Sequence, residues 1–445
     1  MKIGSSDANL SRVDQWSFLF LAITLVPVAV IPFLGGIDDF LIETTFAILA
    51  VESALLMVFI NGIFGKLYYL FSYFFFSITP WIQFKNSIVF WGFPKVLDHI
   101  FFEINCILII LNFIFLISYL AGIRVRSKIP LTNSNEFLIT RHQYKFLVLI
   151  VFFSSFFIFY LANFNPENLF FRTGGADRLE VDQIIGLLLV PVYFLPFICV
   201  AYYLINVKKT IFKVLILMLP MLLVLFPTGL PRNFNALIYL TLLLINFPGL
   251  RAGNRLPFFV YIGLVFVFPL LENFRSYGEN EYEFLPAYDF FLAPHFDTYQ
   301  SFAIAYQHKI ITFGYQLLGP MLFFIPRIYW ESKPIGSGHF VANIFELPFT
   351  NISSNIYAEA YINFGVIGCI VFSIALGYFG GKFSYQLASN QESIPKKIVL
   401  YGAAAYFIYF LRGDLMSPTA YFSGFVFCIL LVWFFLQLIN PSKKI

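Results

Sequence analysis

The chain has 445 residues, of which 60% are hydrophobic, 21% are aromatic and only 12% are charged. Soluble domains carry about 25% charged residues, so this composition excludes an ordinary soluble protein. The formal net charge is only +4 and the Lys and Arg residues are scattered, so no nucleic-acid partner is indicated. We therefore predict an all-α polytopic membrane protein that forms a single integral membrane domain over residues 1–445.

Apolar runs recur along the whole sequence. A transmembrane helix needs about 20 apolar residues, and on this rule we predict about twelve spans. In chain order they are Ser17–Leu34, Phe40–Ile60, Leu67–Phe84, Ile100–Ala121, Phe146–Phe164, Ile184–Ile205, Ile211–Phe226, Asn235–Phe247, Leu256–Leu271, Ile356–Gly380, Ile398–Leu411 and Pro418–Leu438. The eighth and the eleventh are short, which is consistent with half-buried or broken helices.

The Lys and Arg residues are unequally divided between the two sides of these spans. If the N-terminus is inside, the inner loops and termini hold most of them, whereas the longer outer segments hold few. Loops rich in Lys and Arg remain in the cytoplasm. Both termini are therefore predicted to be cytoplasmic.

Two external loops follow from this orientation, at residues 165–183 and 273–355. The second is by far the longest, and its apolar stretch Ile311–Ile325 is interrupted by glycines and a proline. We expect that stretch to form an interfacial helix against the membrane. Polar, charged and prolyl residues crowd the end of this loop. Because such residues are costly beside a bilayer unless they face water or have a function, the active site is expected here.

Four arginines stand at the external ends of predicted spans or in the long external loop: Arg232, Arg275, Arg327 and Arg412. Any one of them has a simple structural explanation, because arginines at a membrane edge extend their side chains to lipid headgroups. Four on the same side, in loops otherwise poor in cations, favour a shared ligand. A guanidinium group stays charged and binds phosphate oxygens in a bidentate manner, so an external lipid-linked pyrophosphate is the predicted ligand.

Two residues are candidates for a general base. His339 is flanked by glycines in IGSGHF, which lets the backbone approach a ligand closely. Glu359 lies at the head of a predicted helix, where a carboxylate near the membrane is expected to be paired or functional. Two structural explanations of Glu359 are also open. Asn355 can cap the start of the helix, or Glu359 can form an ion pair with Lys333.

Three other polar residues have weaker claims. His295 and Asp297 lie in a loop, where water alone satisfies them, and Asp414 is expected to orient Arg412. The sequence contains no Walker loop, GxGxxG, HExxH or GxSxG motif, so ATP, dinucleotide and zinc or serine hydrolase chemistry are not supported.

The residues of the long loop resemble a known family. FIPRIYWESKP, followed by SSNIYAEAYINFGVIG, resembles the O-antigen polymerases of the Wzy type, the oligosaccharide repeat-unit polymerases. The strongest signal is R-x-x-W-x-x-K-P followed by E-x-Y-x-N-F-G. PTGLPRNF, HFDTYQSFAIAYQHKIITFGYQLLG and LRGDL also resemble this family, so the resemblance covers approximately Pro227 to Pro418.

The resemblance implies a glycosyltransferase on the outer face of the bacterial inner membrane that uses undecaprenyl-pyrophosphate-linked oligosaccharides. The growing glycan would be transferred onto an incoming lipid-linked unit, in a GT-C-like fold, without a metal or other cofactor. Membrane lipids and a chain-length regulator are the implied partners. The substrate-binding residues carried over are Arg232, Arg275, Arg327, Lys333, Arg412 and Asp414, and the base candidates are His339 and Glu359.

Three rival functions are considered. An O-antigen ligase uses the same donor but a lipid A-core acceptor, and it ranks second because the KP and NFG elements resemble polymerases. A lipid-linked oligosaccharide flippase predicts two comparable halves with charges at membrane depth, whereas these charges gather at the outer rim. A membrane scaffold predicts that single Arg→Ala substitutions are tolerated.

Overall fold

The computed structural model describes residues 15–36, 38–124, 138–171, 183–206, 208–273, 288–389 and 392–439. Within these ranges the chain is helical and contains no β-strand, which confirms the predicted all-α class. Six helices are long and apolar enough to cross a membrane: α2 (Phe40–Phe59), α5 (Asp98–Arg124), α6 (Arg141–Leu161), α17 (Ile356–Ser389), α18 (Ile394–Arg412) and α19 (Met416–Ile439). The number of spans remains a prediction beyond these six.

The described part of the chain contains further helices, most of them shorter than these six. The first half adds α1 (Gln15–Val30), α3 (Ile63–Phe71), the π-helical η2 (Ser72–Ile78), α4 (Thr79–Lys85), α7 (Glu167–Phe170), α8 (Gln183–Ile205) and α9 (Ile211–Val224). The second half adds α10 (Arg232–Asn235), π-helical η3 (Ala236–Leu240), α11 (Thr241–Asn246), α12 (Arg255–Ile262), π-helical η5 (Gly263–Val267), α13 (Phe268–Asn273), α14 (Thr298–Gln307), α15 (Leu318–Met321) and α16 (Ser337–Ile344). Each of the twelve predicted apolar segments therefore falls largely on helix.

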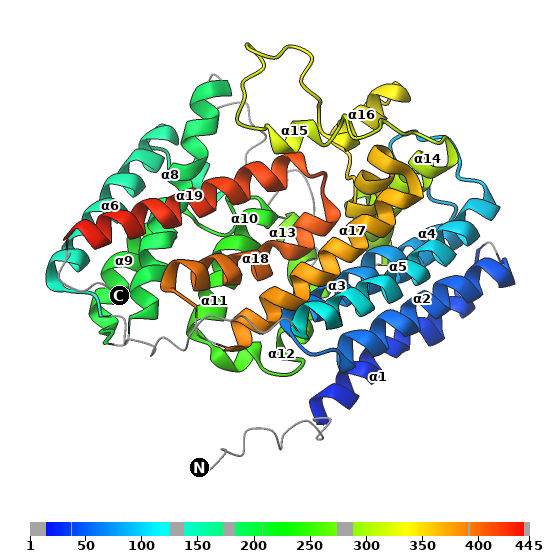
Figure 1. Ribbon diagram of the computed structural model, residues 1–445, viewed down its shortest axis with the longest axis horizontal. Helices are drawn as coiled ribbons and strands as arrows, with labels where there is room; N and C mark the ends of the chain where they lie inside the picture. The colour runs from blue at the N-terminus through cyan, green and yellow to red at the C-terminus, as the bar shows by residue number, and fades with distance from the viewer. Residues whose placement is uncertain are drawn as a thin grey trace.

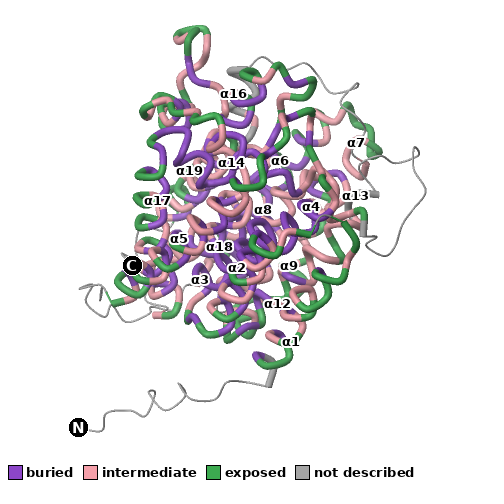
Figure 2. The backbone as a smooth tube through the Cα atoms, turned by 90° about the vertical axis from the view of Figure 1, so that its right-hand side faces the viewer, coloured by how far each residue is buried: buried purple, intermediate pink, exposed green. Residues whose placement is uncertain are grey.

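The outer faces of the long helices are apolar. Phe152, Phe153 and Phe156 of α6 are exposed, as are Ile367 and Val371 of α17. Figure 2 shows buried backbone in the middle of the molecule and exposed stretches around it. Apolar surface of this kind is unfavourable in water but matches lipid, so these faces support a membrane environment.

The buried apolar residues form two clusters. One joins α1 to α5 with α14 and α17, and the other joins α6, α8, α9 and α19. Helix α18 contributes to both, through Ala404 in the first cluster and Tyr406 in the second. In Figure 1, α18 lies between α17 and α19, the two other long helices of the C-terminal region. The interior of the molecule is therefore divided along α18.

Helices α5 and α17 pack through small residues. Ser373, Gly377 and Gly381 recur every four residues on one face of α17, and the Ser373 hydroxyl donates to the carbonyl of Leu111 at 2.7 Å. A Cβ atom at Gly381 would lie 2.1 Å from the carbonyl oxygen of Tyr119, so only glycine allows this approach. Close backbone packing through such residues is a usual way to join helices in a membrane, where no hydrophobic driving force acts between them.

Helix α17 is broken at Phe364 and Gly365, whose backbone angles are not helical. The Cys369 thiol lies 3.4 Å from the carbonyl oxygen of Tyr357, although twelve residues of straight helix would separate them by about 18 Å. The segment from Ile356 to Asn363 therefore folds back against the rest of α17. The predicted continuous span Ile356–Gly380 is wrong in this respect, because the NFG sequence forms the break.

The predicted interfacial helix over Ile311–Ile325 is also wrong. Only α15 is helical there. The break in α17 leaves the carbonyls of Ile362 and Asn363 without helical partners, and the N–H groups of Thr312 and Gly314 donate to them instead. Gly314 takes a φ of +88°, a conformation that glycine adopts without strain. Helices α14, α15 and α16 lie together at one end of the molecule (Figure 1).

Candidate active site

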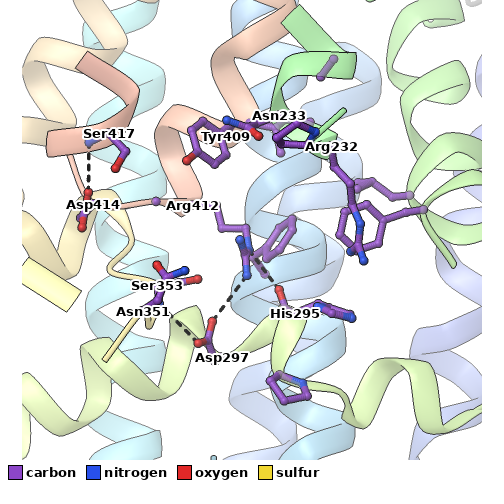
Figure 3. A pocket seen from close by; sticks show the side chains of 18 of the residues that line it. Arg232, Asn233, His295, Asp297, Asn351, Ser353, Tyr409, Arg412, Asp414 and Ser417 are labelled. Atoms are coloured by element: carbon purple, nitrogen blue, oxygen red, sulfur yellow. Dashed lines mark hydrogen bonds and ion pairs between the residues drawn. The ribbon is translucent and has the colours of Figure 1, made fainter. Parts of the chain in front are cut away.

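A cavity of about 430 Å³ lies along α18, between the two apolar clusters. Its polar lining comes from segments far apart in the sequence, and its members are Arg232, Asn233, His295, Asp297, Asn351, Ser353, Tyr409, Arg412, Asp414 and Ser417. Figure 3 shows these side chains arranged around one space. Two of the predicted arginines and one predicted carboxylate are thus brought together.

Arg412 ends α18, and its side chain is 26% exposed. Its Nε donates to the carbonyl of His295 at 3.0 Å, and its Nη2 lies 3.6 Å from Oδ1 of Asp297. Asp297 is 2% exposed, and its Oδ2 accepts from the indole N–H of Trp91 at 2.9 Å and from the N–H of Ser353 at 3.3 Å. The hydrogen bond to His295 and the ion pair with Asp297 together position the guanidinium. Asp297, not Asp414, is therefore the acid that pairs with Arg412.

Arg232 reaches the cavity from the first turn of α10, directly after Pro231. Its guanidinium carbon lies 3.9 Å from the centre of the Phe268 ring. A planar guanidinium is favourable over an aromatic face, and the ring limits its range of orientations. Arg232 and Arg412 thus supply two cations to one cavity.

Asp414 lies in the turn between α18 and α19 and faces the cavity. Burial raises the pKa of Asp414, while hydrogen bonds from the N–H groups of Ser417 and Met416 and the nearby His339 oppose this shift. A Cβ atom at Gly336 would lie 2.1 Å from Oδ2 of Asp414, so the start of α16 packs directly against the carboxylate. The raised pKa brings Asp414 closer to the range of a useful general base.

His339 and Glu359 interact electrostatically with this carboxylate but do not line the cavity. His339 is exposed on α16, and it interacts electrostatically with Asp414. Glu359 is 1% exposed and accepts from the hydroxyl of Ser337 at 2.8 Å and from the N–H of Leu415 at 3.1 Å. Glu359 therefore ties α16 and the turn after Asp414 to the short buried helix that begins at Ile356.

The structural alternatives for Glu359 have different outcomes. Asn355 caps the helix as expected, because its Oδ1 accepts from the N–H groups of Tyr357 and Ala358 at 2.9 Å each. The predicted ion pair with Lys333 is wrong. The Lys333 ammonium instead donates to the carbonyls of Phe323 and Ile325 at 2.7 and 2.9 Å. The carboxylate of Glu359 accepts hydrogen bonds from Ser337 and Leu415.

Arg327 and Lys333 lie outside the cavity lining. Arg327 donates through its two terminal nitrogens to the carbonyls of Lys333 and Pro334 at 2.7 and 3.2 Å. Burial, with Arg327 nearby, lowers the pKa of Lys333, which is 9% exposed. Both cations hold the 323–334 turn in shape. Arg275 and most of the 165–183 loop lie outside the described residues.

The rest of the cavity is apolar. Each of the three π-helical segments contributes to it, through Phe75 in η2, Leu240 in η3 and Leu264 in η5, and Ile408 of α18 lines it as well. π-Helical turns are rare and often occur at functional sites. The cavity therefore joins a cationic region to an apolar wall, which suits a ligand with an anionic head and a hydrocarbon tail.

Several lining residues were missed from the sequence. Trp91, Asn233, Asn351 and Tyr409 were assigned no role, although Asn233 follows Arg232 in PTGLPRNF, and Asp297 was considered weak because a loop residue is easily solvated. The only available signal for Asp297 was its place in HFDTY within the family resemblance. No group of three or more His, Cys, Asp or Glu side chains in the described part of the chain is placed to hold a metal ion.

The fold and the cavity define a helical protein whose described part has six helices able to cross a membrane, with a cavity that brings two arginines next to an apolar wall. The sequence model of the family described as O-antigen polysaccharide polymerase Wzy matches residues 352–443, and this match confirms the predicted resemblance. The matched region contains α17, α18 and α19 with Glu359, Arg412 and Asp414, and it supports a function of the O-antigen-polymerase type in the broad sense. No curated protein and no solved structure matches the chain.

Proposed function

We propose that this protein polymerises undecaprenyl-pyrophosphate-linked oligosaccharide repeat units into O-antigen or a related surface polysaccharide. The growing glycan is transferred from its lipid carrier onto an incoming lipid-linked unit. The observation that carries the proposal is the convergence of Arg232, Arg412 and Asp414 in one cavity that continues into an apolar wall.

The two arginines fit the leaving group. A glycosyl pyrophosphate needs stabilisation of the negative charge that develops as its C1–O bond breaks, and preorganised guanidinium groups supply this. Asp297 and Phe268 hold the two groups in place before substrate binds. The apolar wall then accommodates the beginning of the lipid chain.

Asp414 is the proposed general base. The acceptor hydroxyl oxygen attacks C1 of the donor sugar, the bond from C1 to the pyrophosphate oxygen breaks, and the lipid pyrophosphate leaves with the bonding electrons. The hydroxyl proton passes to the carboxylate of Asp414. His339 and Glu359 are positioning residues in this scheme, since they act through Asp414 and the turn that holds it.

The remaining features follow from the same proposal. The cavity faces the external side of a bacterial inner membrane, with both termini in the cytoplasm and about twelve spans in a GT-C-like arrangement. Arg275, which lies outside the described residues, stays a proposed ligand of the pyrophosphate. Arg327 and Lys333 shape the part of that loop next to α16. A chain-length regulator is a further proposed partner.

The test is the surface polysaccharide of a strain that lacks this protein, complemented with wild type, Arg412→Ala or the control Lys95→Ala. Lys95 is an exposed cation outside the cavity. We expect Arg412→Ala at normal expression to lower polymer formation at least 100-fold, leaving lipid A-core with a single repeat, because charge stabilisation of the leaving group is lost. Lys95→Ala should restore the full ladder.

Other outcomes would contradict the proposal. Accumulation of lipid-linked polymer with no repeat on the core indicates a ligase. Accumulation of single lipid-linked units on the cytoplasmic face indicates a flippase. A normal ladder from Arg412→Ala indicates a scaffold without an arginine site.

A further inference from the structure

One end of the cavity is formed by two stacked aromatic rings. The ring centroids of Trp91 and Phe349 lie 4.4 Å apart with an angle of 22° between the rings. Both residues line the cavity together with Asn351 and Ser353. Phe349 is 38% exposed, so the pair is placed at the mouth rather than in a closed core.

Trp91 is held in an unusual conformation. Its φ is +57°, in the left-handed region that bulky residues seldom adopt. The loop around it is fixed to α14, because Gln300 accepts from the N–H of Phe90 at 3.1 Å and donates to the carbonyl of Ile88 at 2.6 Å. The indole N–H donates to Asp297. Two bonds thus fix the loop and a third fixes the ring that it carries.

This aromatic pair is directly linked to the anion site. One carboxylate, Asp297, binds the indole of Trp91 through Oδ2 and faces Arg412 through Oδ1. In Figure 3, Asn351 and Ser353 lie beside Asp297, on the same side of the cavity as its ion pair with Arg412. A group attached to an anion at Arg412 therefore lies next to the two rings.

The chemistry of this end matches a sugar. A pyranose presents an apolar C–H face, which packs on an aromatic ring, and a rim of hydroxyl groups, which need hydrogen-bonding partners. The two rings supply the apolar surface, and the Asn351 amide and the Ser353 hydroxyl supply polar groups at its edge. A phosphate needs neither ring, and a hydrocarbon chain needs neither polar group.

We infer that Trp91 and Phe349, with Asn351 and Ser353, form the subsite for the sugar attached directly to the pyrophosphate. The inference rests on the proposed function and extends it. At this subsite the protein distinguishes the lipid pyrophosphate that bears a sugar from the lipid pyrophosphate without one. It also assigns Asp297 a double role, holding both the cation for the pyrophosphate and the ring for the sugar.

The test measures binding of two probes to the purified full-length protein in detergent. One probe is undecaprenyl pyrophosphate, and the other is the lipid-linked repeat unit isolated from the strain that lacks this protein. We expect wild type to bind the repeat unit more tightly. Phe349→Ala and Trp91→Ala should each reduce that preference about tenfold, because an apolar sugar contact of this size is lost. The affinity of Phe349→Ala for undecaprenyl pyrophosphate should remain unchanged, because the bond from the Trp91 indole to Asp297 is kept in this variant.

Three further variants make the result specific. Trp91→Phe keeps a ring and should retain most of the preference, whereas Arg412→Ala should weaken binding of both probes. Trp330→Ala is the matched control, since this indole donates to the hydroxyl of Ser332 in its own turn and lies outside the cavity lining. If Trp91→Ala fails to fold, the exposed Phe349 carries the test alone.

The contradicting outcomes are distinct. Equal affinity of wild type for the two probes overturns the subsite and leaves the proposed function standing. Equal losses for both probes in Phe349→Ala show that the ring only supports the fold, and they overturn the subsite as well. If wild type binds neither probe, the proposed function fails and the subsite fails with it.

Discussion

The arginines of this protein show how the same side chain serves two purposes. Arg412 and Arg232 are held by one carboxylate and one aromatic ring, and both face a cavity. Arg327 instead donates to main-chain carbonyls of its own turn. Arg412 donates to a carbonyl, that of His295, through Nε only, whereas both terminal nitrogens of Arg327 donate to carbonyls. The local partners therefore decide which arginines keep donors for an anion.

Asp414 is the residue whose removal should separate activity from stability. We expect Asp414→Asn to lower polymerisation at least about 100-fold, because a carboxamide does not accept the hydroxyl proton. The pKa of Asp414 is raised in the folded protein, so ionisation of this group costs stability. That cost is absent below the pKa of the unfolded chain, about 4, and is fully present once the pH exceeds the folded pKa.

Thermal unfolding of wild type and Asp414→Asn between pH 4 and pH 8 checks this prediction. The variant should be at least as stable as wild type at pH 8, and the difference should shrink toward pH 4. As the pH is lowered, the polymerisation activity of wild type should begin to fall at a pH above the usual pKa of an aspartate, because Asp414 becomes protonated there. A variant that is less stable at pH 8 and fully active would contradict both roles.

At the scale of the element, the break in α17 organises the site. It turns the segment Ile356–Asn363 back into the protein, where Glu359 reaches Ser337 and the N–H of Leu415. It also opens the carbonyls of Ile362 and Asn363 for the 312–314 backbone. One interruption of a helix thus connects the long loop, α16 and the turn that carries Asp414.

Gly365 should be essential for this break. Its φ of +64° and ψ of −154° lie in a region that is almost restricted to glycine, so Gly365→Ala should destabilise the protein by about 1–3 kcal/mol. Gly380→Ala in the same helix is the matched control, because a Cβ atom there meets its nearest neighbour at 3.5 Å. The control should be neutral or slightly stabilising.

Thermal unfolding in detergent and the polysaccharide ladder measure the two effects. Gly365→Ala should unfold at a lower temperature and give a weaker ladder than Gly380→Ala. Equal behaviour of the two variants would show that the break in the helix does not organise the site.

At the scale of the whole molecule, the cavity lies where two groups of helices meet along α18. The predicted orientation can be checked with cysteines at two positions, the exposed Asn343 on α16 and the half-buried Lys396 on α18, whose side chain is 40% exposed. In spheroplasts, a membrane-impermeant maleimide should label Asn343→Cys directly and Lys396→Cys only after permeabilisation. Because three of the four native thiols are buried, wild type provides the low background. Labelling of Lys396→Cys in intact spheroplasts would reverse the orientation and move the cavity to the cytoplasmic side.

The sequence by itself determined the class of protein, the positions of the helices and the family resemblance. These depend on the length and hydrophobicity of local segments, and all twelve predicted segments are largely helical. Only the tertiary structure decided which polar residues meet. Arg232, Asp297 and Arg412 are far apart in sequence. Nothing in the local sequence distinguishes the two arginines from Arg327, whose partners lie in its own turn. The break at Gly365 could not be predicted either, because an apolar segment has the same composition whether its helix continues or folds back. Side chains in loops are satisfied by whatever the fold brings near them, so the site is a property of the packed molecule.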